Sequence, residues 1–270
     1  MVVKLLALLL GFASIASIGA SGPEADSDSA EQSLALAKAV ADRDLGQDMI
    51  ATGMMELTLS SGLQRKREVT FLRRESSQQT TDSITRFLSP ASIAGTTVLT
   101  REAEDAVWLF LPALERSRRI SGKKQGAKFA QSDLYFEDLQ VRAAEEDHHR
   151  ILRVDDYEGM EAVVLESVPK SADSSSYSKR ISWILPEVLI PVRIDFFRRS
   201  NQPIKRLEVT HIESIDNIWT VLESTITDLK SGSSTRIVLD SACFNVGLAE
   251  EVFKSHALGR RSQEIECPNA

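Results

Sequence analysis

Residues Phe87 to Leu139 read FLSPASIAGTTVLTREAEDAVWLFLPALERSRRISGKKQGAKFAQSDLYFEDL. Within this stretch, Ala106 to Leu111 is apolar on both alternating faces, which predicts a strand that is covered on both sides. In a protein of this size, one of the two covers can be a bound ligand. A basic strand, Glu115 to Ser121, follows, and then a loop that leads into an acidic helical turn. The stretch therefore predicts a binding cavity rather than a catalytic centre.

Short segments separated by turn residues continue on both sides of this stretch, a pattern typical of an antiparallel β architecture. The predicted strands are 49–59, 64–74, 80–87, 96–101, 106–111 and 115–121 in the first half, and 150–155, 161–168, 177–185, 191–198, 204–211, 218–229 and 234–241 in the second. A capping box at Ser29-x-x-Gln32 predicts a helix near the N-terminus, and Ala249 to Leu258 predicts a last helical turn that ends at Gly259. The fold class is thus mainly β with α, a strongly curved antiparallel sheet closed or half closed around helices.

The first twenty residues have the pattern of a cleaved signal peptide, with Lys4 before an apolar core and small residues at its end. The alternative, a membrane anchor, needs roughly 20 apolar residues, which this stretch lacks. We predict a signal peptide over 1–20, a disordered N-terminus over 21–28, a single domain over 29–260 and a C-terminal tail over 261–270. The formal net charge of −7 disfavours nucleic acid as a partner, because phosphate binding depends on a surplus of Lys and Arg.

The only two cysteines are Cys243 and Cys267. In an exported protein they can close a disulfide, which at this loop length would stabilise the fold by about 3 kcal/mol. The alternative is two free thiols, with Cys267 on a frayed terminus. The spacing is far from a Cys-x-x-Cys redox motif in either case.

Several short motifs in a fixed order resemble one known family. They are Phe87-x-x-Pro90 with Gly95-Thr96 and Leu99, Trp108 to Ala113, Arg118-Arg119-Ile120, and Phe129 with Ser132-Asp133 and Tyr135-x-Glu137-Asp138-Leu139. The chain resembles the LolA-like family of bacterial periplasmic proteins, which sort outer-membrane lipoproteins. The resemblance implies an unclosed β-barrel whose helices cover or lid a hydrophobic cavity, and it extends loosely over most of the chain after the signal peptide.

The chain departs from the family pattern at one loop. A Met-Gly pair commonly stands where this chain has Ala130-Gln131, and losing the Gly removes backbone freedom there. The residues that the resemblance suggests as a lid are Phe129, Ser132, Asp133, Leu134 and Tyr135.

Large aromatic residues are the candidates for lining the cavity, because an acyl chain is held by burial of apolar area and not by directional contacts. These ligand-binding candidates are Trp108, Phe110, Trp183, Phe196 and Trp219. The alternative is that they fill an ordinary core. Arg116, Arg118 and Arg119 are candidates for contact with a lipid headgroup or a partner protein at the cavity mouth, or else form an exposed strand face.

Enzymatic signatures are missing from the sequence: it has no Gly-x-Ser-x-Gly elbow, no His-Glu-x-x-His helix and no phosphate-binding loop. His148-His149 beside Glu145 to Asp147 has metal-ligand residue types without a ligand spacing, and a solvated turn explains it better. We therefore expect no catalytic residue, no metal and no cofactor.

The hypothesis that follows is a monomeric periplasmic carrier or chaperone. It binds a lipid or the acyl chains of a lipoprotein in a hydrophobic cavity and, through transient contact with a membrane or membrane protein, hands them to a partner such as an inner-membrane transporter. One alternative is a non-carrying accessory subunit of an inner-membrane export complex. A second alternative is an extracytoplasmic hydrolase with dispersed catalytic residues.

Overall fold

The computed structural model describes residues 23–76, 80–259 and 267. The predicted signal peptide and most of the predicted C-terminal tail lie outside these residues. Within the described part of the chain, no helix is both long enough and apolar enough to cross a membrane.

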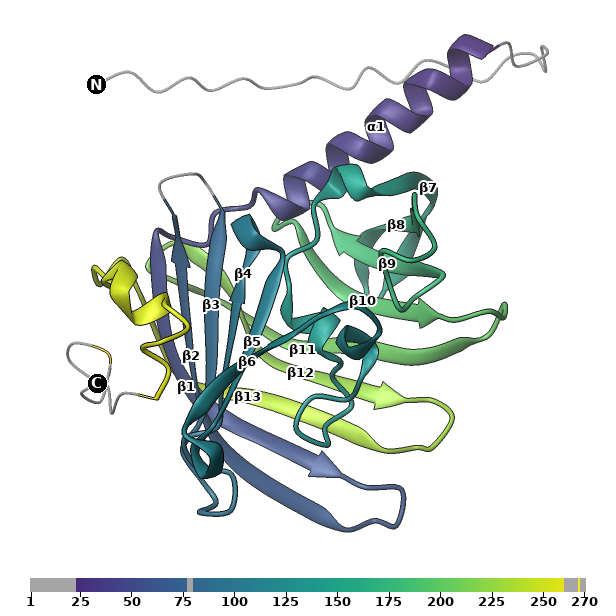
Figure 1. The fold of residues 1–270 in the computed structure, drawn as a ribbon. Coiled ribbons are helices and arrows are strands. Elements are labelled where there is room, and N and C mark those ends of the chain that lie inside the picture. Colours follow the sequence, from purple (N-terminus) through teal and green to yellow (C-terminus); the bar gives the residue numbers. More distant parts are fainter. Residues whose placement is uncertain (1–22, 77–79, 260–266, 268–270) are drawn as a thin grey trace, which may run out of the picture.

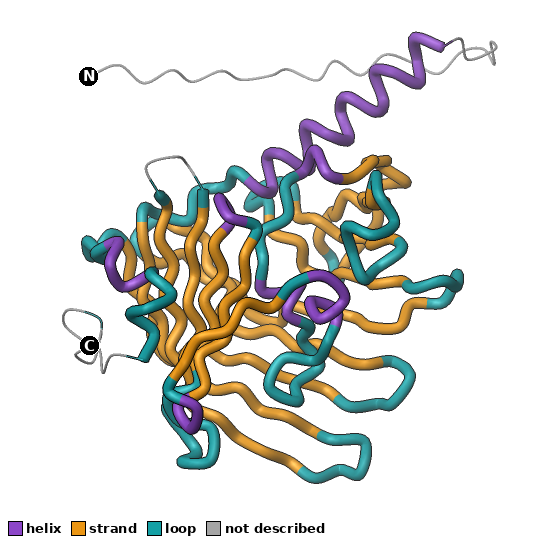
Figure 2. The backbone as a smooth tube through the Cα atoms, in the orientation of Figure 1, coloured by secondary structure: helices purple, strands orange, loops and turns teal. Residues whose placement is uncertain are grey.

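A single antiparallel sheet of thirteen strands dominates the molecule (Figures 1 and 2). The strands of its first half are β1 (Asp48–Thr58), β2 (Gln64–Glu75), β3 (Thr81–Phe87), β4 (Thr97–Arg101), β5 (Ala106–Leu111) and β6 (Arg116–Ile120). Those of its second half are β7 (Asp147–Tyr157), β8 (Met160–Pro169), β9 (Lys179–Leu185), β10 (Ile190–Phe197), β11 (Pro203–Ile215), β12 (Ile218–Asp228) and β13 (Ser234–Phe244). Every strand predicted from the sequence is present, which confirms the mainly β fold class.

The strand order shows that the sheet is an unclosed barrel. It runs β6-β5-β4-β3-β2-β1-β13-β12-β11-β10-β9-β8-β7, so two meanders are joined by the pairing of β1 with β13. β6 and β7 stand at opposite ends of this order. A connection of residues 121–146, which we call the connector, runs from one to the other (Figure 1).

Bulges give the sheet much of its bend. The register shifts between Thr52 and Gly53 on β1 and again within β7, β10 and β11. A β-bulge bends a strand and increases its twist. At Gly53 the backbone approaches β13 so closely that a Cβ atom would lie 2.1 Å from the carbonyl oxygen of Val238, so only glycine fits there. The glycine thereby allows the two meanders to meet at a tight curve.

The two faces of the first meander are both buried, as the apolar sequence of β5 predicts. We call the face that carries Leu57, Val69 and Phe87 the inner face, and it packs against the connector. Directly paired residues share a face, so the inner face continues through Leu109 on β5 and Ile226 on β12.

The outer face of the first meander is covered by the C-terminal segment 246–258. Phe253 and Leu258 pack there against Ile50, Leu72 and Leu99. Within the helical turn predicted over Ala249 to Leu258, Glu250–Phe253 forms a 3-10 turn, η6, so the turn is present but shorter than predicted. The segment is too short for a stable helix of its own and is fixed instead by contacts with the sheet.

Two contacts hold this C-terminal segment in place. The buried carboxylate of Asp48 accepts hydrogen bonds from the backbone N–H groups of Val246, Gly247 and Leu248 at 2.7, 2.9 and 2.8 Å. A disulfide joins Cys243 on β13 to Cys267, so of the two alternatives for these cysteines the structure has the bonded one. The end of the described chain is therefore attached to the sheet covalently.

The helix α1 (Pro23–Ala41) packs against the β7 end of the sheet (Figure 1). It begins six residues before the predicted Ser29 start and takes in residues 23–28.

Candidate functional site

The connector fills the inner side of the sheet with its own apolar side chains. Phe129, Leu134 and Phe136 are buried in the inner-face core. The ring of Phe129 lies 5.5 Å from the ring of Phe87 and 5.6 Å from that of Phe136. The connector therefore occupies the space that the sequence predicts as a cavity.

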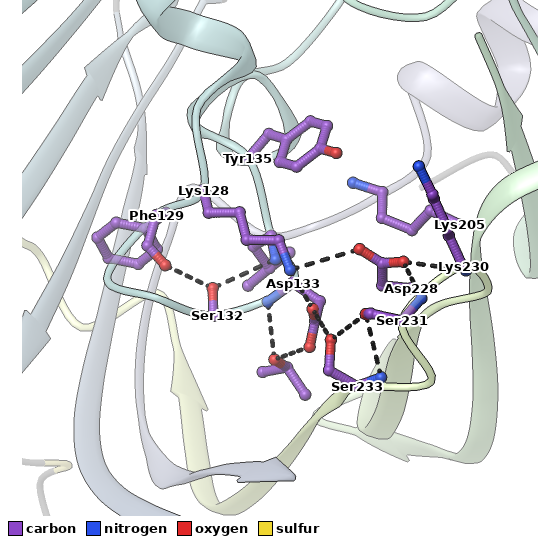
Figure 3. Close-up of polar contacts among 12 residues, drawn as sticks. Lys128, Phe129, Ser132, Asp133, Tyr135, Lys205, Asp228, Lys230, Ser231 and Ser233 are labelled. Atoms are coloured by element: carbon purple, nitrogen blue, oxygen red, sulfur yellow. Dashed lines mark hydrogen bonds and ion pairs between the residues drawn. The ribbon is translucent and has the colours of Figure 1, made fainter. Parts of the chain in front are cut away.

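A buried carboxylate, Asp133, anchors the middle of the connector to β13 (Figure 3). It accepts hydrogen bonds from Lys128 Nζ at 2.8 Å, Ser233 Oγ at 2.7 Å and Thr235 Oγ1 at 3.0 Å. The backbone N–H of Asp133 also donates to Thr235 Oγ1 at 2.9 Å. Burial alone would lower the pKa of Lys128, but the hydrogen bond and charge of Asp133, with those of Asp228, raise it. These contacts favour the charged pair and keep the connector seated.

The loop between Phe129 and Ser132 takes a conformation that favours glycine. Ala130 and Gln131 have φ angles of 49° and 60°, in the left-handed region. The carbonyl of Ala130 accepts a hydrogen bond from the buried Arg67, and the side chain of Gln131 accepts one from Arg65 at 2.8 Å. The loop thus adopts a backbone that the replaced Gly would tolerate, and β2 arginines hold it there.

A second polar cluster holds the end of the connector at the 3-10 turn η4 (Phe136–Leu139). Lys205 on β11 is only 2% exposed and donates hydrogen bonds to Asp138 and to the hydroxyl of Tyr177. That hydroxyl donates to the other oxygen of Asp138 at 2.8 Å. We call these three residues the Lys205 cluster.

Aromatic rings surround the ammonium group of Lys205. Its Nζ lies 4.2 Å from the ring centroid of Tyr135, 4.7 Å from that of Phe196 and 4.8 Å from that of Tyr177. Burial lowers the pKa of Lys205, while the neighbouring Asp138 opposes that change. Burial raises the pKa of Tyr177, and the Asp138 charge raises it further. The arrangement is a buried ion pair whose two members are both hydrogen-bonded to Tyr177.

A pocket of about 260 Å³ with a mixed polar and apolar lining lies where the connector approaches β3 and β4. Its lining residues include Thr81, Thr100, Arg101, Gln140 and Glu146. This volume is below the roughly 300–1,000 Å³ of common small-molecule sites, and the mixed polar lining does not suit an acyl chain. Among the residues that the structure describes, no three His, Cys, Asp or Glu side chains are grouped so that they could hold a metal ion. His149 bonds instead to Ser167 and to the carbonyl of Ala144.

The five aromatic candidates do not come together at one site. Trp108 and Phe110 lie on the outer face and pack against the C-terminal segment. Trp183 belongs to a separate core cluster, lies 4.2 Å from the Arg193 guanidinium and donates to Asp155 at 3.1 Å. Phe196 contacts the Lys205 cluster, and Trp219 is 43% exposed on β12. Alternation separated the two faces of β5 but could not tell which one faces inward.

The three arginine candidates lie on the edge strand β6. Arg116 and Arg118 are exposed and, by their pairing with Leu111 and Leu109, share the inner face. Arg119 is on the other face and donates to the carbonyls of Glu104 and Asp105 at 3.0 and 3.2 Å. Arg116 and Arg118 therefore lie on the side of the sheet that the connector covers, and Arg119 lies on the opposite side.

Similar folds are known from solved structures. A domain from Vibrio parahaemolyticus described as an outer membrane lipoprotein-sorting protein matches with a TM-score of 0.80 and 28% identity, over 86% of this chain and 100% of that one. A DUF1329 family protein from Desulfovibrio piger matches with a TM-score of 0.80 and 27% identity, over 85% and 99% of the two chains. A LolA superfamily protein from Nitrosomonas europaea shares the fold, with a TM-score of 0.64 and 18% identity over 84% and 97%.

A protein-family model with the description "Uncharacterized protein" matches residues 79–260, more than half of the chain. No curated protein matches. The chain belongs to the LolA-like family of outer-membrane lipoprotein-sorting proteins. The unclosed barrel expected from this resemblance is confirmed.

Two parts of this LolA-like protein were not found from the sequence. One is the use of Asp133 as an anchor on β13, and the other is the Lys205 cluster. A signal for the second was present, because alternation along β11 places Lys205 on the same face as Leu207. A charged residue on an otherwise apolar strand face needs a buried partner, and the nearest acidic run in the family block is Glu137-Asp138.

Proposed function

We propose that this LolA-like protein is a periplasmic carrier that binds a lipid, or the acyl chains of a lipoprotein, on the inner face of its sheet. The single observation that supports this most is the nature of the cover on that face. Three buried side chains of one irregular connector, with Ala130 and Leu139 packed beside them, cover the apolar surface in place of a packed helix or a second sheet. Such a cover can be displaced without unpairing any strand.

An acyl chain can bury more apolar surface than the connector side chains that it would replace. Burying one Phe or Leu side chain contributes roughly 1.5–3 kcal/mol, so Phe129, Leu134 and Phe136 together contribute about 7 kcal/mol. An acyl chain of about sixteen carbons gains roughly 12 kcal/mol at 0.8 kcal/mol per CH₂. The difference can offset part of the loss of the Asp133 and Lys205 contacts.

Other inner-face residues extend the apolar surface beyond the connector. Ile194 on β10 and Leu207 on β11 are both half-buried and lie directly opposite each other in the strand pairing. Leu207 also pairs with Ile226, which belongs to the inner-face core. We propose this row as the continuation of the acyl site, and that the carrier then passes its cargo to an inner-membrane or outer-membrane partner without covalent chemistry.

The test combines extraction with a binding titration. Protein purified without detergent is expected to release lipid into organic solvent, detected by mass spectrometry, and to bind a fluorescent undecanoic-acid probe. Leu207→Asp should weaken probe binding by about tenfold, since it places a charge on the apolar face. Leu114→Asp is the matched control, because Leu114 is already 54% exposed.

Two results would contradict the proposal. One is a clean extract together with no probe binding by the wild-type protein. The other is equal probe affinity in the two aspartate variants, with circular dichroism showing that both are folded. Turnover of ester substrates by the pure protein would instead support a hydrolase.

A further inference from the structure

The edge strand β6 has unpaired backbone N–H and C=O groups along its outer side, as far as the described residues show. Arg116–Ile120 pairs with β5 on one side only, at the end of the strand order. On its other side, no backbone group of these five residues bonds to another segment within 23–76, 80–259 and 267. Such an edge is a template for an additional strand.

The opposite edge of the sheet, strand β7, is covered by the helix α1. The helix α1 packs against β7, and the backbone N–H of Ile151 donates to Ser33 Oγ of that helix at 2.9 Å. An ion pair of 2.7 Å between Lys38 and Glu145 fastens the helix further. Sheets generally protect their edges, so the contrast between β7, which α1 covers, and β6, whose free side pairs with no described backbone, indicates different uses.

The charges on β6 define what the edge can receive. Arg116 and Arg118 are exposed, and neither makes an ion pair or hydrogen bond with a residue that the structure describes. They are two residues apart and on the same face, which is the repeat of a strand. Arg119 differs, because the carbonyls of Glu104 and Asp105 already hold it.

We propose that the β6 edge binds an acidic, extended segment of a partner protein as an additional strand. Carboxylates at alternate positions of that segment would meet Arg116 and Arg118, and backbone hydrogen bonds would fix its register. The inference deepens the proposed function, because it names the chemistry of the carrier's partner. It rests on that function only for the existence of such a partner.

The expected complex is weak and sensitive to salt. The added strand gains only five residues of backbone pairing and two exposed ion pairs, and much of that free energy is lost to the cost of association. We expect a dissociation constant of about 0.1 mM. Salt screens exposed charges, so affinity should fall as ionic strength rises. A contact of this strength suits a carrier that must leave its partner again.

The experiment titrates the full protein with a fluorescein-labelled peptide of seven residues that alternates valine with aspartate. Fluorescence anisotropy at low salt should show binding, and Arg116→Glu with Arg118→Glu should weaken it by about tenfold. The matched control reverses two exposed charges elsewhere, Arg199→Glu with Lys230→Glu, and should change the affinity by less than about twofold.

Alternately N-methylated peptides separate strand addition from simple charge attraction. In a strand, only every second N–H points to a given neighbour, so one methylation register should abolish binding and the other should not. Hydrogen exchange should also slow at those alternate amides of Arg116–Ile120 that point away from β5 when the peptide binds.

Three outcomes would overturn the inference: equal binding of both methylated peptides, no peptide binding, and full binding by the Arg116→Glu/Arg118→Glu variant. Its failure is distinguishable from failure of the carrier function. The acyl-probe titration of the wild-type protein reports on the inner face alone, whereas the peptide titration reports on the β6 edge.

Discussion

At the scale of single residues, the backbone of the connector is strained at one position, and a single substitution can relieve that strain. Gln131 is exposed and has φ of 60°, a conformation that costs a residue with a side chain roughly 1–2 kcal/mol. Gln131→Gly should therefore raise the free energy of unfolding by up to about 0.5 kcal/mol, after the extra entropy of glycine in the unfolded chain and the loss of the exposed hydrogen bond from Arg65. Urea denaturation measures it.

The control for this prediction is Gln140→Gly in the same connector. Gln140 has φ of −94°, so glycine relieves no strain there and should destabilise. If Gln131→Gly were as destabilising as Gln140→Gly, the strain at Gln131 would not be real.

The Lys205 cluster is the second feature at this scale. Lys205→Met leaves the buried Asp138 carboxylate without its cation, which should lower the free energy of unfolding by about 3–5 kcal/mol. Lys205→Met combined with Asp138→Leu removes both charges and should recover much of that loss. Chemical denaturation of the wild type and of the single and double variants tests this, and equal stability of the two variants would contradict it.

At the scale of secondary-structure elements, a buried carboxylate and two arginines form an ion-pair cluster on β10 and β11 of the second meander. Asp195 on β10 is buried and accepts hydrogen bonds from Arg206 at 2.7 Å and from Arg193 at 2.7 Å. Burial alone would raise the pKa of Asp195, but these arginines lower it below its usual value.

The sign of the pH dependence follows from that lowered pKa. The unfolded chain holds the Asp195 proton more tightly, so the stabilisation is complete above about pH 4 and is lost as the pH falls through the folded-state value. Denaturant midpoints should therefore drop between pH 5 and pH 2, and Asp195→Asn should make that drop smaller. An unchanged drop in the variant would assign acid sensitivity to other carboxylates.

Sequence patterns at this scale predicted the strands well and the site poorly. Alternation and turn residues were enough for all thirteen strands, because each is a local signal. They could not orient the faces, so Trp108 and Phe110 were proposed for the ligand although they pack under the C-terminal segment. The cover of a strand face comes from residues far away in sequence, such as Phe253 on Ile50, and single-strand periodicity contains no information about it.

At the scale of the whole molecule, the pairing of β1 with β13 joins residues far apart in the chain. Thr52 and Ser241, which bond to each other at 2.7 Å, are separated by 189 positions. Proteins dominated by distant strand pairing fold on the scale of milliseconds to seconds. We expect stopped-flow refolding in that range, followed by tryptophan fluorescence with the disulfide intact. Complete refolding within about 100 μs would show that β1–β13 pairing is not part of the slow step.

One meander contains the six strands β1 to β6 and the other the seven strands β7 to β13. Within the described chain, the connector is the only covalent link between them. A protease that cut the connector between Ser121 and Ala127 would leave two fragments, each with all the strands of one meander. The two fragments would stay associated through the hydrogen bonds between β1 and β13. Neither fragment would lose a strand. This protein is therefore suited to reconstitution from two separately expressed pieces, in which the inner-face cover becomes a tail attached at one end.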